Sequence, residues 1–82
     1  MGVSRLQEKV LQNFGDTVRR IRKSKGISQE ILADMCELHR TYLSDVELGK
    51  RNISLENIDK IACALGMTVS ELFQEVDRRA GL

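Results

Sequence analysis

Apolar residues recur at steps of three and four positions along most of the chain, which is the spacing of one face of an α-helix. The first such run stops before Gly26, a residue type that favours the left-handed conformation of a helix C-terminal cap. Its apolar positions are Leu6, Val10, Phe14, Val18 and Ile21. We therefore expect a first helix that ends just before Gly26 and carries charged residues on its other faces.

The continuity of this first helix is open, because Asn13 and Gly15 lie in its interior. A glycine in a helix interior costs about 1 kcal/mol relative to alanine. The residues before Phe14 could therefore belong to one long helix or form a separate turn ahead of it.

Two short helical segments follow. Ser28 is a suitable N-cap for a helix that reaches about Met35. After a turn at Glu37, a second helix covers about residues 39–48, and Gly49 closes it. The expected inward positions are Leu32, Ala33 and Cys36 in the first helix and Leu43 and Val46 in the second.

Two further helices complete the chain. Ser54 caps the earlier one, which Gly66 ends. Thr68 and Glu71 form a capping box for the later one, since the hydroxyl and the carboxylate can each accept from a backbone N–H at the helix start. The apolar faces consist of Leu55, Ile58, Ile61, Ala62 and Leu65, and then of Leu72, Phe73 and Val76, with Arg78, Arg79 and Gly81 at the end.

These segments predict an all-α fold, a compact bundle of five helices. The 82 residues are too few to divide their apolar side chains between two cores, so we expect one domain over residues 1–82. The absence of proline and the low aromatic content of 4% also favour helices over an aromatic-rich sheet. Neither an internal repeat nor a linker interrupts the chain.

The charge of the chain is unevenly distributed. The net charge is +1, but residues 1–25 carry +5 and the remainder carries −4. The charged residues of that basic end are Arg5, Lys9, Arg19, Arg20, Arg22, Lys23 and Lys25 against Glu8 and Asp16. Such an end could meet a polyanion, although a charged run on a helix is commonly no more than a solvated face.

Candidate chemistry for catalysis or metal binding is sparse. Cys36 and Cys63 lack the spacing of a zinc site, and His39 is the single histidine, so we expect no metal, no cofactor and no enzymatic activity. Both cysteines suit core or interface packing. The chain has neither a secretion signal nor an apolar run long enough to cross a membrane, which predicts a cytoplasmic protein.

The residue identities at the two short helices are more specific than their spacing, which alone would fit an ordinary helical hairpin. The motifs, in order, are Ser28-Gln29-Glu30, Leu32-Ala33, Arg40-Thr41-Tyr42-Leu43, Glu47-x-Gly49-Lys50-Arg51 and Ala64-Leu65-Gly66. Over residues 14 to about 75 the chain resembles the Cro and cI repressor-like helix-turn-helix family. Within that family, residues 38–43 look like the controller proteins of bacterial restriction-modification systems, which are small dimeric regulators.

The resemblance implies a helix-turn-helix over about residues 28–48, with residues 39–48 as the recognition helix in the major groove. Arg40 would be the principal reader of bases, because a guanidinium can donate two hydrogen bonds to guanine. Thr41 and Ser44 could add base contacts. Asp45 would accept from a cytosine amino group or orient Arg40.

The resemblance also implies contacts to DNA phosphates, which give affinity without sequence. Gln29 would clamp a phosphate at a helix N-terminus, and Arg19 or Lys23 could add long-range attraction. The remaining expected phosphate ligands are Tyr42, Lys50, Arg51 and Asn52, and His39 is either a further one or an ordinary surface histidine.

Two further features follow from the same resemblance. Arg22 and Glu47 match a family pattern in which these side chains form a largely buried ion pair that braces the DNA-binding unit. Glu37 stands where the family often has glycine or asparagine. Either its backbone is left-handed and carries about 1 kcal/mol or more of strain, or the turn takes another form.

The resemblance finally implies a homodimer on an operator in double-stranded DNA, with dimerisation helices over about residues 54–80. The expected interface residues are Cys63, Met67, Val69, Leu72, Phe73 and Val76, unless these only close the core of one protomer. An antitoxin-like or regulatory module that binds a protein is the alternative function. Contact with RNA polymerase stays open, because no residue identifies it.

Overall fold

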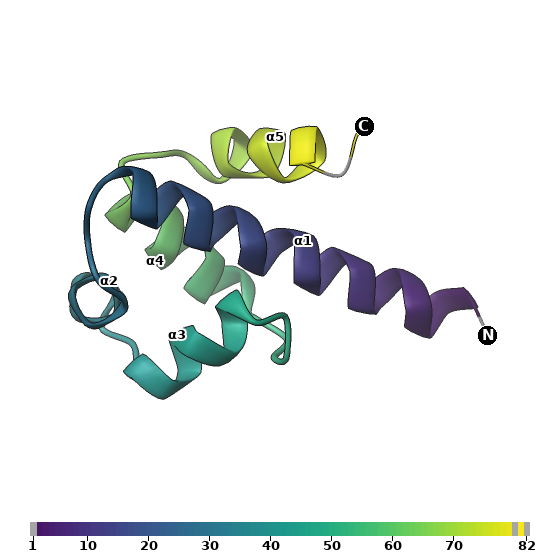
Figure 1. The fold of residues 1–82 in the computed structure, drawn as a ribbon, viewed down its shortest axis with the longest axis horizontal. Coiled ribbons are helices and arrows are strands. Elements are labelled where there is room, and N and C mark those ends of the chain that lie inside the picture. The colour runs from purple at the N-terminus through teal and green to yellow at the C-terminus, as the bar shows by residue number, and fades with distance from the viewer. Residues whose placement is uncertain (1, 80, 82) are drawn as a thin grey trace.

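The computed structural model describes residues 2–79 and 81, with side chains from Lys9 onward. Five helices follow one another along this part of the chain, and it contains no strand (Figure 1). Their bounds are α1 Gly2–Ser24, α2 Gln29–Cys36, α3 Arg40–Glu47, α4 Leu55–Ala64 and α5 Val69–Arg79. The predicted all-α fold is therefore confirmed. None of the described helices has the length and apolar character needed to cross a membrane.

The long helix α1 runs through the middle of the molecule. It packs against α3 on one side and against α5 on the other, while α2 contacts both α3 and α4 (Figure 1). The N-terminal end of α1 projects beyond the other helices. The two short helices α2 and α3 are thus held from behind by α1 and α4.

The core lies where the five helices meet. Its largest fully buried side chains are aliphatic, from α1 through α5, and the rings of Phe14 and Phe73 lie 5.6 Å apart between α1 and α5. Two positions of the predicted apolar faces are wrong, because Val10 and Leu55 are exposed. Helical spacing identifies a face of a helix, but it does not show which turns of that face another helix covers. The side chain of Leu6 lies outside the described residues.

Helix α1 is continuous through Gly15, which settles the alternatives that the sequence left open. A Cβ atom at Gly15 would lie 2.2 Å from the carbonyl oxygen of Val46. The glycine therefore lets α1 lie directly against the backbone of α3, where a side chain would collide with it.

The predicted helix caps are present. Ser28 Oγ accepts a hydrogen bond from the N–H of Ile31, and Ser54 Oγ accepts one from Asn57, each at 3.1 Å. Both bonds of the capping box between Thr68 and Glu71 also form, at 2.9 and 3.0 Å. These bonds define where α2, α4 and α5 begin.

The two cysteines differ in environment. Cys36 is buried between α2 and α4 and donates to the carbonyl of Lys60 at 3.7 Å, and burial raises the pKa of its thiol to about 11. Cys63 is exposed, and both thiols are free. Among the described residues no group of three potential metal ligands lies together.

Candidate nucleic-acid interface

The turn between α2 and α3 sets the angle of the two short helices. Glu37 has φ 58° and ψ 40°, which is the left-handed conformation and one of the two forms that the sequence left open. The turn is held by two hydrogen bonds, from Glu37 N–H to Asp34 and from Leu38 N–H to Ala33. A non-glycine residue in this conformation costs about 1 kcal/mol or more, so the turn retains local strain that the surrounding packing must overcome.

The outer face of α3 is open to solvent at its beginning. Arg40 and Thr41 are exposed and Ser44 is half-buried, whereas Leu43 and Val46 are buried on the opposite side. The side chains of Gln29, Arg40, Thr41 and Ser44 line a shallow hollow of about 290 Å³. His39 is the N-cap residue but makes no side-chain cap bond, so the first turn of α3 keeps unpaired N–H groups for another acceptor.

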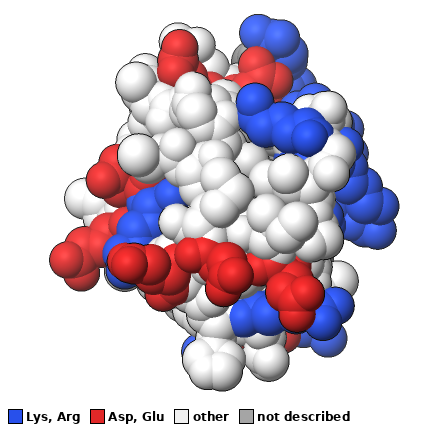
Figure 2. Space-filling model, turned by 90° about the vertical axis from the view of Figure 1, so that its left-hand side faces the viewer, with Lys and Arg blue, Asp and Glu red and all other residues white. Residues whose placement is uncertain are grey.

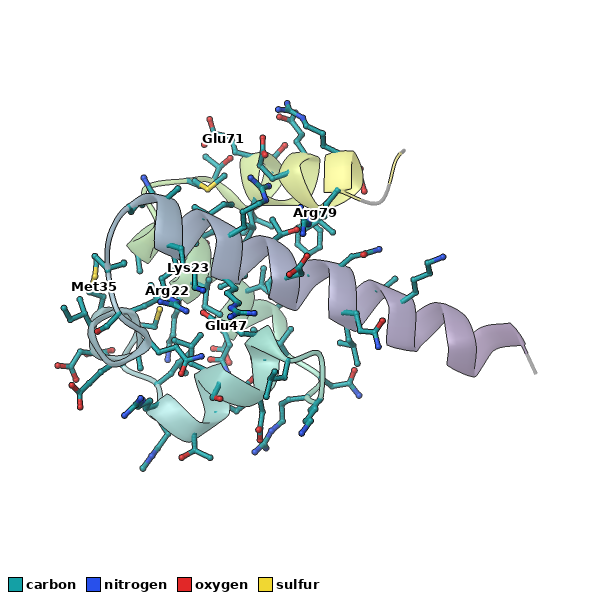
Figure 3. All side chains as sticks on the ribbon, in the orientation of Figure 1. Arg22, Lys23, Met35, Glu47, Glu71 and Arg79 are labelled. Atoms are coloured by element: carbon teal, nitrogen blue, oxygen red, sulfur yellow. The ribbon has the colours of Figure 1, made fainter. Side chains whose placement is uncertain are left out.

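A buried ion pair connects α1 to the end of α3 (Figure 3). Arg22 donates from Nε to Glu47 Oε2 at 2.7 Å and from Nη2 to Glu47 Oε1 at 3.0 Å. A third bond, from Nη1 to the carbonyl of Ile27 at 2.9 Å, fixes the loop before α2. The pair that the sequence predicted is thus formed with bidentate geometry, and it joins α1, α2 and α3 at one point.

Gln29 takes part in this same network. Its Nε2 donates to Glu47 Oε1 at 2.9 Å, and the side chain is half-buried. The sequence predicted that Gln29 clamps a phosphate, but one of its two amide hydrogens is already committed to Glu47. In the structure Gln29 therefore acts first as a link between the start of α2 and the end of α3.

A second polar chain follows α3 on its other flank. Asp45 Oδ2 lies 3.6 Å from Arg51 Nη2, and the Arg51 guanidinium lies over the ring of Tyr42, 5.0 Å from its centroid. Asp45 thus pairs with Arg51, and the alternative in which it orients Arg40 does not describe the structure. The Tyr42 hydroxyl accepts from Asn57 Nδ2 at 3.1 Å, which leaves its own hydrogen available for an acceptor outside the protein.

The loop after α3 presents Lys50, Arg51 and Asn52, all of which are exposed. Hence the residues predicted to face DNA occupy one region, made of the start of α2, the outer face of α3 and this loop. The sequence did not indicate that Gln29 bonds to Glu47 or that Asn57 supports Tyr42, because both contacts join residues far apart in the chain and follow no local spacing.

The candidate interface residues of α4 and α5 fall into two groups. Leu72 and Val76 are buried within the protomer, so the alternative holds for them, and they close its core. Cys63 is exposed, and the partly buried members are Met67, Val69 and Phe73. A second protomer could reach these four side chains, whereas Leu72 is fully buried and Val76 is only 6% exposed.

Comparison with known proteins places this geometry in a family. A family profile described as helix-turn-helix matches residues 18–72, which is 55 of the 82 residues. The control protein C.BamHI of Bacillus amyloliquefaciens is 58% identical over 60 residues, which cover 72% of this chain and 74% of that protein. The control protein C.MunI of a Mycoplasma species is 47% identical over 66 residues, which cover 79% of this chain and 89% of that protein.

Solved structures give the same assignment. The restriction-modification controller protein C.AhdI of Aeromonas hydrophila matches with a TM-score of 0.75 and 49% identity, over 77% of this chain and 96% of that one. The controller protein C.Esp1396I, in a tetramer bound to its natural 35 base-pair operator, matches with a TM-score of 0.82 and 27% identity, over 89% and 96% of the two chains. The chain therefore belongs to the Cro and cI repressor-like helix-turn-helix family and is similar to the controller proteins of restriction-modification systems.

Proposed function

We propose that this protein is a transcriptional regulator that binds a specific operator in double-stranded DNA as a homodimer and controls a restriction-modification operon. In this proposal it acts in the cytoplasm by binding alone, without catalysis and without a cofactor. The observation that carries the proposal is the exposure of Arg40 and Thr41 at the start of a helix whose opposite face is buried.

The proposed readout of sequence depends on the first turn of α3. A helix of this diameter fits the major groove of B-form DNA with its N-terminal residues against the base edges. Arg40 can donate two hydrogen bonds to the O6 and N7 atoms of a guanine, a contact worth about 1–3 kcal/mol of discrimination between bases. Thr41 and Ser44 lie along the same face and would read neighbouring bases. Asp45, on the flank where it pairs with Arg51, would accept from a cytosine amino group.

The proposed phosphate ligands flank this face and carry no sequence information themselves. Tyr42 has a hydroxyl hydrogen to donate, and the stacking of Arg51 on its ring holds both side chains toward one edge of α3. His39, Lys50, Asn52 and the N-terminal turn at Gln29 complete the set. Such contacts position the recognition helix and make affinity depend on salt concentration.

Dimer formation would supply the second half of the contacts. One domain of this size makes few contacts to bases, and two recognition helices about 34 Å apart would match half-sites one helical turn apart. The exposed or half-buried residues Cys63, Met67, Val69 and Phe73 support an interface on α4 and α5. The relatives support it as well, since C.Esp1396I was solved as a tetramer on its operator.

The proposal can be tested with an operator selected from a pool of randomised duplexes. We expect the wild-type protein to enrich a two-fold symmetric sequence and to bind it more weakly as salt is raised. Arg40→Ala should reduce the preference for that sequence over a scrambled duplex by about 5- to 150-fold, the equivalent of 1–3 kcal/mol. Failure to enrich any duplex, or binding that salt leaves unchanged, would favour the alternative of a protein-binding module.

RNA polymerase is included in the proposal as a partner of the DNA-bound dimer. The outer side of α2 presents three exposed carboxylates, Glu30, Asp34 and Glu37, beside the exposed apolar side chains of Ile31 and Met35. Figure 2 looks onto this end of the molecule, where a row of acidic side chains borders an uncharged area. We expect Asp34→Lys to retain operator affinity and to change transcription from the regulated promoter in a purified system. Unchanged transcription would remove polymerase contact by this face from the proposal.

A further inference from the structure

A second hollow lies beside the recognition helix, on the side of α1. It has a volume of about 210 Å³ and is lined by Arg19, Arg22 and Lys23 of α1, Gln29 of α2, and Ser44, Glu47 and Leu48 at the end of α3. It shares Gln29 and Ser44 with the hollow in front of Arg40 and Thr41. The two hollows are therefore neighbours on the same side of the molecule.

The charges around this second hollow favour an anion. Three cationic side chains and one carboxylate line it, which leaves a formal balance of +2. The carboxylate of Glu47 is already engaged by two bonds from Arg22 and one from Gln29. The two remaining cations, Arg19 and Lys23, are exposed and stand one helical turn apart on α1.

The neighbouring cations of α1 have other surroundings. Arg20 lies on the opposite side, where its Nη2 is 3.4 Å from Glu75 of α5. None of the ion pairs formed within residues 9–79 involves Arg19 or Lys23. Lys23 lies beside the Arg22–Glu47 pair in Figure 3, and basic side chains gather along one edge of the face in Figure 2.

We propose that this hollow is a binding site for a backbone phosphate of duplex DNA, in which Arg19 and Lys23 provide the cations. The inference rests on the proposed function and assigns to α1 a direct contact with DNA. It also transfers the main phosphate role at this edge from Gln29, whose amide is committed to Glu47, to the two side chains of α1. The bidentate Arg22–Glu47 pair has a second effect there, because it keeps the buried carboxylate from repelling the phosphate.

The matched variants are Arg19→Gln/Lys23→Gln and, as a control, Arg20→Gln/Lys25→Gln. Each removes two positive charges from residues 19–25, but the control residues lie outside the hollow. If both side chains contact phosphate, the slope of log affinity against log salt should fall by about 0.9 for each lost contact. That corresponds to about an eightfold loss per contact at 0.1 M salt, equal on the selected operator and on a scrambled duplex. Chemical denaturation of the wild type and of both double variants checks that each variant remains folded.

A second experiment removes the charge of one phosphate of the DNA instead of the charges of the protein. Each operator in this series carries a single methylphosphonate at a different position. We expect one position per half-site at which the wild type loses affinity. At that position the affinity of Arg19→Gln/Lys23→Gln should not fall further. The Arg20→Gln/Lys25→Gln control should lose affinity there as the wild type does. Equal salt slopes for the two double variants, or equal sensitivity at every phosphate, would overturn the site. The proposed function would survive the loss of this site if the wild type still binds the operator and Arg40→Ala still loses its preference for it.

Discussion

The part of the molecule where α1, α2 and α3 meet and the half formed by α4 and α5 are held together in different ways. Where α1, α2 and α3 meet, a polar joint is added to the apolar core, since the carboxylate of Glu47 receives three hydrogen bonds from Arg22 and Gln29. Where α5 closes against α1, the buried contacts are apolar and include Leu72 and the pair of Phe14 with Phe73. The two ion pairs between these helices, Arg20–Glu75 and Asp16–Arg79, lie outside the buried core.

The difference reflects what each half must do. Apolar packing has little directional preference, so it provides stability while tolerating small shifts. Hydrogen bonds to a charged group have a fixed length and angle, and the bidentate pair therefore fixes the position of α3 relative to α1 and α2. A buried pair is weak evidence for added stability, so we interpret it as a positioning device.

The largest expected effect is on the polar joint. Glu47→Ala leaves the guanidinium of Arg22 buried without its partner and should lower the free energy of unfolding by about 3–5 kcal/mol, measured by chemical denaturation. Asp16→Ala, which breaks the exposed pair with Arg79, is the matched control and should cost less than about 1 kcal/mol. Equal losses in the two variants would contradict the distinction between the joints.

A rescue experiment separates positioning from stability. The double variant Arg22→Met/Glu47→Leu replaces the pair with apolar side chains and should recover most of the stability lost in Glu47→Ala. We expect it to bind DNA with reduced preference for the selected operator, because α3 is no longer fixed by directed bonds. Full preference in the rescued variant would show that apolar packing positions α3 equally well.

A variant of the apolar joint should lose stability but keep its preference for the operator. Leu72→Ala removes a fully buried side chain of α5 and should lower the free energy of unfolding by about 2–5 kcal/mol. At a temperature where the variant is still folded, its preference for operator over scrambled DNA should equal that of the wild type. A loss of preference for the operator in folded Leu72→Ala would show that the two halves act as one functional unit.

A smaller effect is expected where α1 approaches α3. Gly15→Ala places a methyl group against the carbonyl oxygen of Val46 and should cost about 1–3 kcal/mol as the helices separate. Exposed Ser24, at the end of the same helix, provides a control in Ser24→Ala, which should change stability by less than about 0.5 kcal/mol. Gly15→Ala as stable as the wild type would mean that α1 and α3 separate at no cost.

The smallest effect concerns the turn. Glu37→Gly removes the strain of a left-handed non-glycine residue and should raise the free energy of unfolding by about 1 kcal/mol. The same change at exposed Asp34, inside α2, should instead destabilise the protein by about 0.5–1 kcal/mol. Denaturation curves that shift in the same direction for both variants would contradict the strain at Glu37.

Much of the fold could be predicted from local patterns. The caps at Ser28, Ser54 and Thr68 and the apolar spacing depend on residues a few positions apart, and the structure has these features where the sequence predicts them. The exposure of Val10 and Leu55 could not be predicted in this way, because it depends on which turns of a helix a distant helix covers.

The candidate site divides in the same manner. The exposed positions of α3 follow from its own amphipathic pattern, and the Arg22–Glu47 pair was expected from the resemblance to a family. The bond from Gln29 to Glu47, the pairing of Asp45 with Arg51 and the support of Tyr42 by Asn57 join side chains of different elements. No spacing in the sequence identifies such contacts, since the tertiary fold alone brings these groups together.

The contact of Arg40 with a guanine can be measured atom by atom. Replacing single guanines of the selected operator by 7-deazaguanine removes the N7 acceptor of a bidentate contact. We predict that one such position per half-site weakens the wild-type protein by about five- to tenfold and leaves the affinity of Arg40→Ala unchanged. If the wild type and Arg40→Ala lose the same factor at every guanine, Arg40 does not read the operator and the account of α3 as the recognition helix fails.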